Sequence, residues 1–243
     1  MTLFLTSSPC IDGAPRAILN PANGFLDRLR QALPENPRCL FIASSPDRRD
    51  LTCRFGADMF LAFAEAGIHF SAYQVLDGFN AEDAAELIFD SDFLILAGGH
   101  VPTQYTFFRD IHLDVLLQEF EGTILSISAG SMNAAWEVYI QPEEAGESLD
   151  PDFVRFAPGL GLTSVSVCPH YQKVKHSMLD GKRLFEDITY PDSQGRSFCA
   201  LPDGSYILVE DGSEILYGEA YRIRNGILEQ LCINGKSLDL KKL

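Results

Sequence analysis

The chain of 243 residues can bury a large core, and its 46% hydrophobic and 22% charged residues are ordinary for a globular protein, which excludes wholesale disorder. Its formal net charge of −15 repels phosphate backbones and anionic membranes, so we expect neither a nucleic-acid nor a membrane partner. The apolar runs are too short to span a bilayer, the N-terminus lacks a basic leader, and the six cysteines suggest neither a disulfide framework nor a zinc site, which predicts a cytoplasmic protein.

The first half of the chain alternates between short apolar runs and segments with helical spacing. Apolar residues share one helical face within residues 25–33 and 51–63, which predicts two helices. Strands that are apolar throughout and separated by helices are typical of a parallel sheet covered on both faces. The sequence therefore predicts an α/β fold with three layers and a mostly parallel sheet, whose first five strands are residues 3–6, 39–43, 68–75, 93–97 and 123–127.

The pattern changes in the second half, where extended segments alternate with turn signals. Such signals between short strands predict β-hairpins, and one helix is predicted near residues 177–187. We expect a single α/β domain over residues 1–243, with a C-terminal hairpin extension at about residues 195–243. The turn signals are Pro202-Asp203-Gly204, Asp211-Gly212 and Asn225-Gly226.

Ser128 stands where the fifth predicted strand ends in a small-residue turn and an alanine-rich segment follows. A strand, a sharp elbow and a helix in this order push the serine hydroxyl out of the sheet. The first N–H groups of the helix then point at the group that the hydroxyl attacks. Ser128 is therefore the candidate nucleophile, and we expect its neighbours Ser126 and Ser131 to be structural.

A serine nucleophile needs a base, and the base needs a third group that holds its tautomer. Among five histidines, His170 follows a strand-like run and Pro169. Ligands bind at the edge of an open α/β sheet where its strands end, so His170 is our candidate for the base. We read His69, His112 and His176 as packing or surface residues.

A Gly-Gly pair, Gly98 and Gly99, ends the fourth predicted strand. Two glycines at such a point let the backbone approach a ligand closely and present N–H groups to a developing oxyanion. A plain tight turn is the alternative reading of Gly-Gly by itself. Its combination with the elbow at Ser128 favours the catalytic reading.

These features together resemble a known family. The Gly-Gly turn, the Ser-Ala-Gly elbow and the Pro-His pair are similar to those of the serine peptidases that include peptidase E (aspartyl dipeptidase) and cyanophycinase, over about residues 1–190. The resemblance implies the flavodoxin-like fold of the class I glutamine amidotransferases. It also implies Ser128 as nucleophile, His170 as base and an oxyanion hole at the N–H groups of Gly99 and Ala129.

The resemblance extends to the acidic partner of the base. Glu143 best matches the family's acidic residue by its distance after the nucleophile. Glu137, Glu144 and Glu147 lie close enough in the sequence to compete for this role.

Candidates for substrate binding follow from the same comparison. Peptidase E binds an N-terminal aspartate, whose carboxylate suits a planar guanidinium, and Arg183 lies about where the family carries such an arginine. Lys182 or Lys173 could take its place, and a helix-surface charge is the alternative for Arg183. His100 stands where the family often has a small amide, so it could bind substrate or fill that space, and Gln104 is a further candidate.

The expected function is that of a serine hydrolase that cleaves small peptides through an acyl-enzyme, without a cofactor or metal. A homodimer is left open. Two other functions also remain: a non-catalytic protein that binds a metabolite in the same pocket, and an esterase of the α/β-hydrolase type. The esterase ranks third because Ser126 occupies the first glycine position of its usual Gly-x-Ser-x-Gly elbow.

Overall fold

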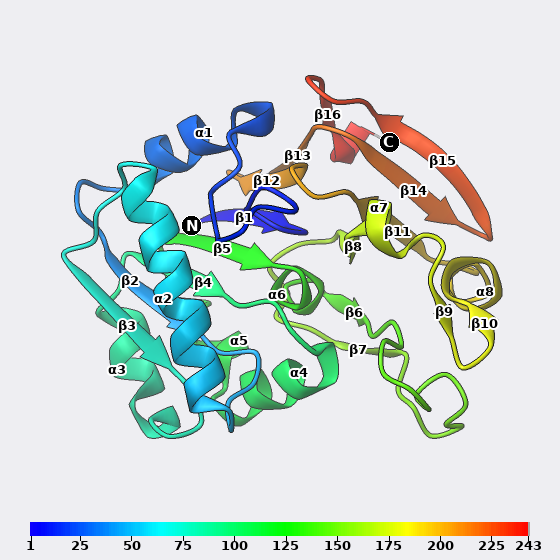
Figure 1. Cartoon of the computed structure of the whole chain (residues 1–243), viewed down its shortest axis with the longest axis horizontal. Coiled ribbons are helices and arrows are strands. Elements are labelled where there is room, and N and C mark those ends of the chain that lie inside the picture. The colour runs from blue at the N-terminus through cyan, green and yellow to red at the C-terminus, as the bar shows by residue number, and fades with distance from the viewer. Residues whose placement is uncertain (243) are drawn as a thin grey trace.

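A central sheet of eight strands organises the computed structural model, which describes residues 1–242 (Figure 1). Five of its strands run parallel in the order β1-β5-β4-β2-β3, as the apolar runs predict. The α/β fold class with a mostly parallel sheet is therefore confirmed. These strands are β1 (Thr2–Thr6), β2 (Arg38–Ile42), β3 (Ala72–Leu76), β4 (Phe93–Leu96) and β5 (Thr123–Ile127).

Helices cover both faces of this sheet because alternate side chains of each strand point to opposite sides. In β4, Phe93 and Ile95 join a core cluster with α1 (Phe25–Ala32) and α2 (Arg49–Glu65). Leu94 and Leu96 join the opposite cluster with the helices of the other face. The helices of this second face are α3 (Ala84–Phe89), α4 (Val101–Asp110) and α5 (Leu113–Leu116). Short 3₁₀ segments elsewhere in the chain span Ala22–Gly24, Ala81–Asp83 and Leu240–Lys242.

The C-terminal hairpins extend the central sheet at β1, beyond its parallel part. β12 (Tyr206–Glu210) pairs antiparallel with β1 and turns at Asp211-Gly212 into β13 (Ser213–Tyr217). Both turn residues have the positive φ angles that a tight hairpin requires. β16 (Ser237–Asp239) completes the sheet beside β13.

A second sheet of four strands lies beside the first, on the right in Figure 1. Its order is β15-β14-β11-β8, and the pair β8 and β11 runs parallel while the others are antiparallel. A two-stranded ribbon of β6 (Glu137–Tyr139) and β7 (Phe156–Pro158) adjoins the short helix α6 (Ala129–Asn133). The strands of the second sheet are β8 (Ser166–Pro169), β11 (Ser197–Leu201), β14 (Ala220–Arg224) and β15 (Ile227–Cys232).

The prediction of a helix near residues 177–187 is wrong. Residues Met178–Leu179 (β9) and Lys182–Arg183 (β10) form a small antiparallel hairpin instead. Asp180 and Gly181 between them have φ angles of 50° and 80°, which a tight hairpin turn needs and a helix does not allow. A π-helical turn (Leu184–Thr189) and the short helix α8 (Tyr190–Asp192) follow, while α7 (Tyr171–Val174) precedes the hairpin.

Among residues 1–242, no helix combines the length and the apolar character that a bilayer span requires.

Candidate active site

Ser128 forms the elbow between β5 and α6, with φ 49° and ψ −109°. Such a backbone conformation costs a non-glycine residue about 1–3 kcal/mol and persists only where the surroundings enforce it. The Ser128 N–H donates to the Thr6 carbonyl at 2.9 Å, which ties the elbow to the end of β1. The strained turn leaves Ser128 partly exposed at the C-terminal edge of the parallel strands.

Two buried serine hydroxyls hold the elbow in place through hydrogen bonds to β1. Ser131 Oγ donates to the Thr6 carbonyl at 2.8 Å and accepts the Thr6 N–H at 3.0 Å. Ser126 Oγ lies 3.0 Å from Ser131 Oγ and donates to the Phe4 carbonyl. Ser126 and Ser131 are both fully buried, so they link β1, β5 and α6 and cannot act on a ligand.

Gly130 permits the close packing of α6 against β4. A Cβ atom at this position would lie 2.6 Å from the Leu96 carbonyl oxygen, closer than a real Cβ contact. The small residue after the elbow therefore serves the packing of the helix that follows Ser128.

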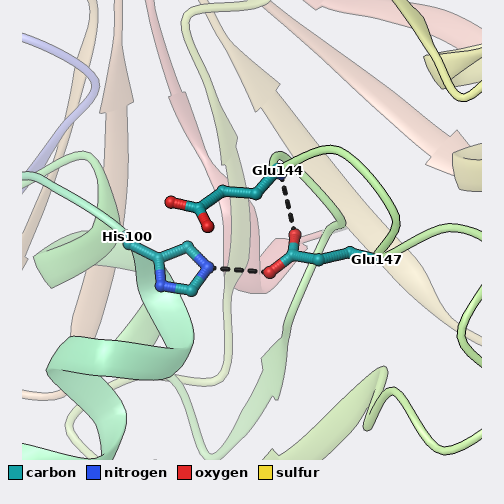
Figure 2. A group of neighbouring side chains, drawn as sticks. All are labelled: His100, Glu144 and Glu147. Atoms are coloured by element: carbon teal, nitrogen blue, oxygen red, sulfur yellow. Dashed lines mark hydrogen bonds and ion pairs between the residues drawn. The ribbon is translucent and has the colours of Figure 1, made fainter.

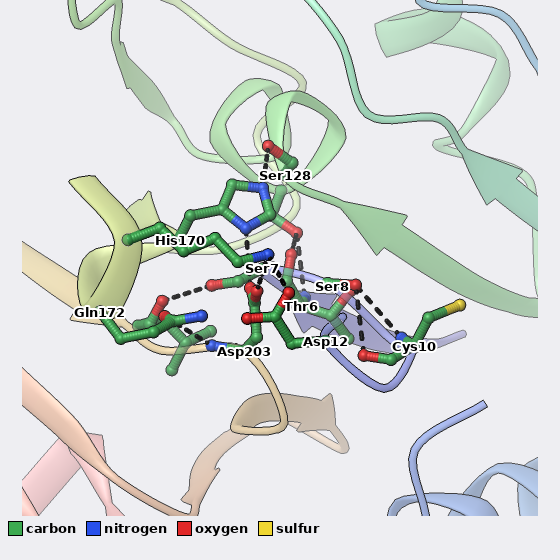
Figure 3. A network of polar contacts seen from close by, with 12 residues as sticks. Thr6, Ser7, Ser8, Cys10, Asp12, Ser128, His170, Gln172 and Asp203 are labelled. Atoms are coloured by element: carbon green, nitrogen blue, oxygen red, sulfur yellow. Dashed lines mark hydrogen bonds and ion pairs between the residues drawn. The ribbon is translucent and has the colours of Figure 1, made fainter. Parts of the chain in front are cut away.

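His170 follows the end of β8 and faces Ser128 (Figure 3). Its Nε2 lies 3.0 Å from Ser128 Oγ, and its Nδ1 lies 2.7 Å from Asp203 Oδ1. A carboxylate can only accept, so a neutral imidazole donates Nδ1–H to it and presents Nε2 as an acceptor to the hydroxyl. The structure thus brings together the predicted nucleophile and the predicted base from two different sheets.

The carboxylate that contacts the His170 ring belongs to Asp203 and not to Glu143. β8 and β11 are parallel neighbours with Pro169 opposite Leu201, so the residues that follow both strands emerge at the same edge. This places His170 and Asp203 next to each other, and the Asp203 side chain is only 4% exposed. The placement of Glu143 at this position is wrong: its Oε1 accepts the Val101 N–H at 3.0 Å instead.

Two of the acidic residues that compete with Glu143 also have other partners. Glu137 pairs with Arg196, and Glu147 bonds His100. The sequence signal for Asp203 is the Pro202-Asp203-Gly204 turn, whereas the resemblance to the family favours acids a short distance after Ser128.

Charges around Asp203 favour its ionised form. Burial works against the carboxylate, but hydrogen bonds from His170 and Lys173 outweigh it, so the pKa of Asp203 lies below its usual value. The contact of Lys173 Nζ with Asp203 Oδ2 is 2.8 Å long. The imidazole therefore faces a permanent negative charge at neutral pH.

The Gly-Gly turn lies against the elbow. A Cβ atom on Gly98 would come within 3.3 Å of the Ser128 Cβ, and the Gly98 carbonyl accepts the Ser44 hydroxyl at 2.6 Å. Gly99 follows as an exposed residue, while Ala129 is the first residue of α6. The first N–H groups of a helix have no partner within it. Of the two predicted oxyanion donors, Ala129 directly follows Ser128 in the chain, and Gly99 follows the glycine that lies against the Ser128 side chain.

His100 anchors a loop instead of standing free for substrate. Its Nδ1 lies 2.7 Å from Thr103 Oγ1, and its Nε2 lies 2.8 Å from Glu147 Oε1 (Figure 2). Burial opposes ionisation of Glu147, but N–H groups of Glu144 and Glu143 and the His100 ring lower its pKa below the usual value. His100 was predicted either to bind substrate or to fill the space of the small amide found in the family. Because both ring nitrogens have partners within the chain, the geometry favours the second role.

The loop held by His100 also reaches the β9–β10 hairpin. Asp180 accepts the N–H groups of Gly146 and Ser148 at 2.8 and 3.2 Å. His100, Glu144 and Glu147 bring three possible metal-ligand atoms within 4.8 Å of one another. The imidazole and the Glu147 carboxylate already satisfy each other in this group.

The substrate-binding role predicted for Gln104 is wrong. Gln104 is fully buried, its Nε2 donates to the Ala97 carbonyl at 2.7 Å, and its Oε1 accepts from Asn133 Nδ2 at 3.1 Å. It links the end of β4 to α6 and supports the Gly-Gly turn. Sequence alone did not distinguish this buried amide from one that faces the ligand.

Arg183 lies on β10, away from the elbow in Figure 1. Its guanidinium makes two bonds to Asp187, at 2.6 and 3.0 Å, and is largely exposed. Within residues 1–242 we find no contact of Arg183 with Ser128, His170 or Asp203. The proposed aspartate-binding role of Arg183 therefore has no geometric support.

A serine, an imidazole and a carboxylate in sequence, at one edge of a mostly parallel α/β sheet, are the arrangement of a serine-type hydrolase. Residues 3–217 match the profile of peptidase family S51, the family of peptidase E and cyanophycinase. The chain belongs to this family and is a serine-type peptidase.

A solved structure shows the same fold. It is that of a protein from Listeria monocytogenes EGD-e that carries the provisional name peptidase E, with a TM-score of 0.54 and 16% sequence identity. The match covers 95% of this chain and 98% of that chain. No curated protein matches the sequence significantly.

Proposed function

We propose that this serine peptidase cleaves small peptides through a covalent acyl-enzyme on Ser128. One observation carries the proposal: Ser128 Oγ, the His170 ring and the Asp203 carboxylate are linked by contacts of 3.0 and 2.7 Å. Both distances lie within the range that proton transfer requires.

The reaction follows from the roles of these groups. His170 Nε2 takes the Ser128 proton as Oγ attacks the scissile carbonyl carbon, and Asp203 stabilises the imidazolium. The N–H groups of Gly99 and Ala129 stabilise the oxyanion, and one such donor contributes about 2.7–4 kcal/mol. The imidazolium then protonates the leaving amine. Water, activated by the same imidazole, releases the acyl group.

The preference for small peptides rests on the loop beside the Gly-Gly turn. Glu143 and Glu147 attach this loop to Val101 and His100, directly after Gly99, and Asp180 holds its other side. Because this loop is attached at both sides, it leaves little room for a folded polypeptide next to the elbow. Arg183 is already paired with Asp187, so this proposal does not include aspartyl specificity.

A fluorophosphonate probe tests the proposal because it reacts only with an activated serine. We expect covalent labelling of the wild type between pH 6 and 9, and no labelling of Ser128→Ala. Ser237→Ala is the matched control, since Ser237 is exposed on β16 and distant in sequence from the elbow. Absence of wild-type labelling throughout this pH range would instead favour the metabolite-binding protein.

Substrate screening separates a peptidase from an esterase. Dipeptides with varied N-terminal residues and p-nitrophenyl esters are compared, each scored against Ser128→Ala. We expect Ser128-dependent cleavage of dipeptides. Ester hydrolysis without any action on dipeptides would replace the peptidase with an esterase.

Three further expectations stay predictions: the single-domain organisation, the cytoplasmic location and the open question of a homodimer. Centrifugation of the purified chain would decide the last of these.

A further inference from the structure

Lys173 lies one turn after His170, in α7, and reaches back to the catalytic carboxylate. Its Nζ lies 2.8 Å from Asp203 Oδ2 and 2.7 Å from Asp12 Oδ1. Asp12 belongs to the segment that follows β1, so a single ammonium joins the beginning of the chain to the turn after β11. Nothing in the proposed reaction yet uses this lysine.

The two oxygens of Asp203 have different partners. Oδ1 contacts His170, whereas Oδ2 is buried and faces Lys173 as its only polar partner among residues 1–242. The Asp203 N–H also donates to Gln172 Oε1 at 3.0 Å. Three residues at the start of one short helix thus hold the carboxylate and its backbone.

We propose that Lys173 is a positioning residue that fixes the Asp203 carboxylate behind His170, with Asp12 holding the ammonium in place. This inference rests on the proposed function of Ser128, His170 and Asp203. The ion pair at Oδ2 opposes rotation of the carboxylate away from the imidazole. The sequence suggested Lys173 only as a substitute for Arg183 toward substrate, whereas its two contacts direct it to Asp203.

The lysine also adjusts the charge that the imidazole meets. Its contacts with Asp12 and Asp203 raise the pKa of Lys173, so it stays cationic through neutral pH. The ammonium partly offsets the negative charge of Asp203. Without it, the imidazole would face a larger net negative charge, and the acidic side of the labelling profile would move to higher pH.

The test measures the second-order rate of fluorophosphonate labelling of Ser128 between pH 5 and 9. For Lys173→Met we expect a rate lower by roughly tenfold at pH 7, because the carboxylate loses its orientation. The labelling rate should rise with pH on the acidic side of the profile, and we call this rise the acidic limb. In Lys173→Met we expect its midpoint to move to higher pH by about half a unit. Lys173→Arg, which keeps the charge, should restore the limb and most of the rate.

Two variants control the experiment. Lys175→Met removes a neighbouring lysine that stands 6.0 Å from the Tyr171 ring and has no recorded contact with Asp203, so its profile should match the wild type. Asp12→Asn keeps the Lys173 contact with Asp203 but removes a negative charge, so it should move the limb slightly in the opposite direction, to lower pH. Salt offers a check on the wild type itself, because Lys173 is 44% exposed: 1 M NaCl should shift its limb toward that of Lys173→Met.

The outcomes distinguish this inference from the proposed function. Wild-type labelling with an unchanged profile in Lys173→Met overturns the positioning role alone. Equal losses in Lys173→Met and Lys173→Arg, without a shift of the acidic limb, would assign the lysine a merely structural part. If the wild type itself is not labelled, the proposed function fails first.

Discussion

The central sheet and the second sheet contribute to the site in different ways. The proposed nucleophile, Ser128, belongs to a local motif of one strand, one turn and one helix, which Thr6 of β1 ties in place. The proposed base and acid lie together only because β8 and β11 align in parallel. A local motif can therefore be read from sequence, whereas a catalytic pair built by strand pairing depends on tertiary structure.

The largest expected effect tests the pair from the second sheet. Asp203→Asn should lower the rate of Ser128 labelling by roughly 10⁴-fold, because the amide no longer favours the imidazole tautomer with a free Nε2. Glu143→Gln should change that rate less than about twofold. A greater loss in Glu143→Gln would restore the acid that the family comparison suggested and contradict the observed pairing.

The next effect compares glycines of the two regions. Gly130→Ala should lower the free energy of unfolding by about 3 kcal/mol, since the new methyl group meets the Leu96 carbonyl. Gly195→Ala, in the loop before β11, meets no atom within 4 Å and costs only about 1 kcal/mol for its φ of 72°. Urea denaturation measures both, and equal losses would disprove the close packing of α6.

A smaller effect follows from the lowered pKa of Asp203. A carboxylate with a depressed pKa in the folded state stabilises the protein above its unfolded pKa, and this contribution disappears as the pH falls through the folded value. Asp203→Asn should therefore cost about 1–2 kcal/mol of stability at pH 7. The difference from wild type should shrink below about pH 4. Urea midpoints at pH 7, 5 and 3.5 measure it, and a difference that grows on acidification would reverse the sign.

The smallest effect concerns the hairpin outside both large sheets. Arg183→Ala removes an exposed ion pair with Asp187, which solvent screens, so the urea midpoint should stay nearly unchanged. The Michaelis constants for Asp-Ala and Ala-Ala dipeptides should both stay within about twofold. A selective rise for Asp-Ala would return the arginine to the substrate site.

The parallel part of the fold was predictable because its strands are buried on both faces and read as continuous apolar runs. The run 123–127 coincides with β5, whereas β3 begins at Ala72, four residues later than the run suggested, although Ile68 is buried. In the sequence, an apolar residue buried outside a strand looks the same as one buried within it. The spacing of apolar residues therefore cannot fix where β3 begins.

The site was predictable only in part for related reasons. Ser128 and the glycines could be found because an elbow has a local signature. Asp203 could not be chosen over Glu143, since its position depends on the register between Pro169 and Leu201. Gln104 and Arg183 show the same limit: nothing in the sequence reveals that one is buried and the other already paired.

The split between two sheets has a consequence during synthesis. A growing chain that has left the ribosome as far as Ser128 carries the elbow but neither His170 nor Asp203. Under the proposed mechanism, its hydroxyl stays an ordinary alcohol until β11, the strand before Asp203, has been translated and aligned beside β8. The proposed mechanism thus keeps the nascent chain inactive until the second sheet has formed.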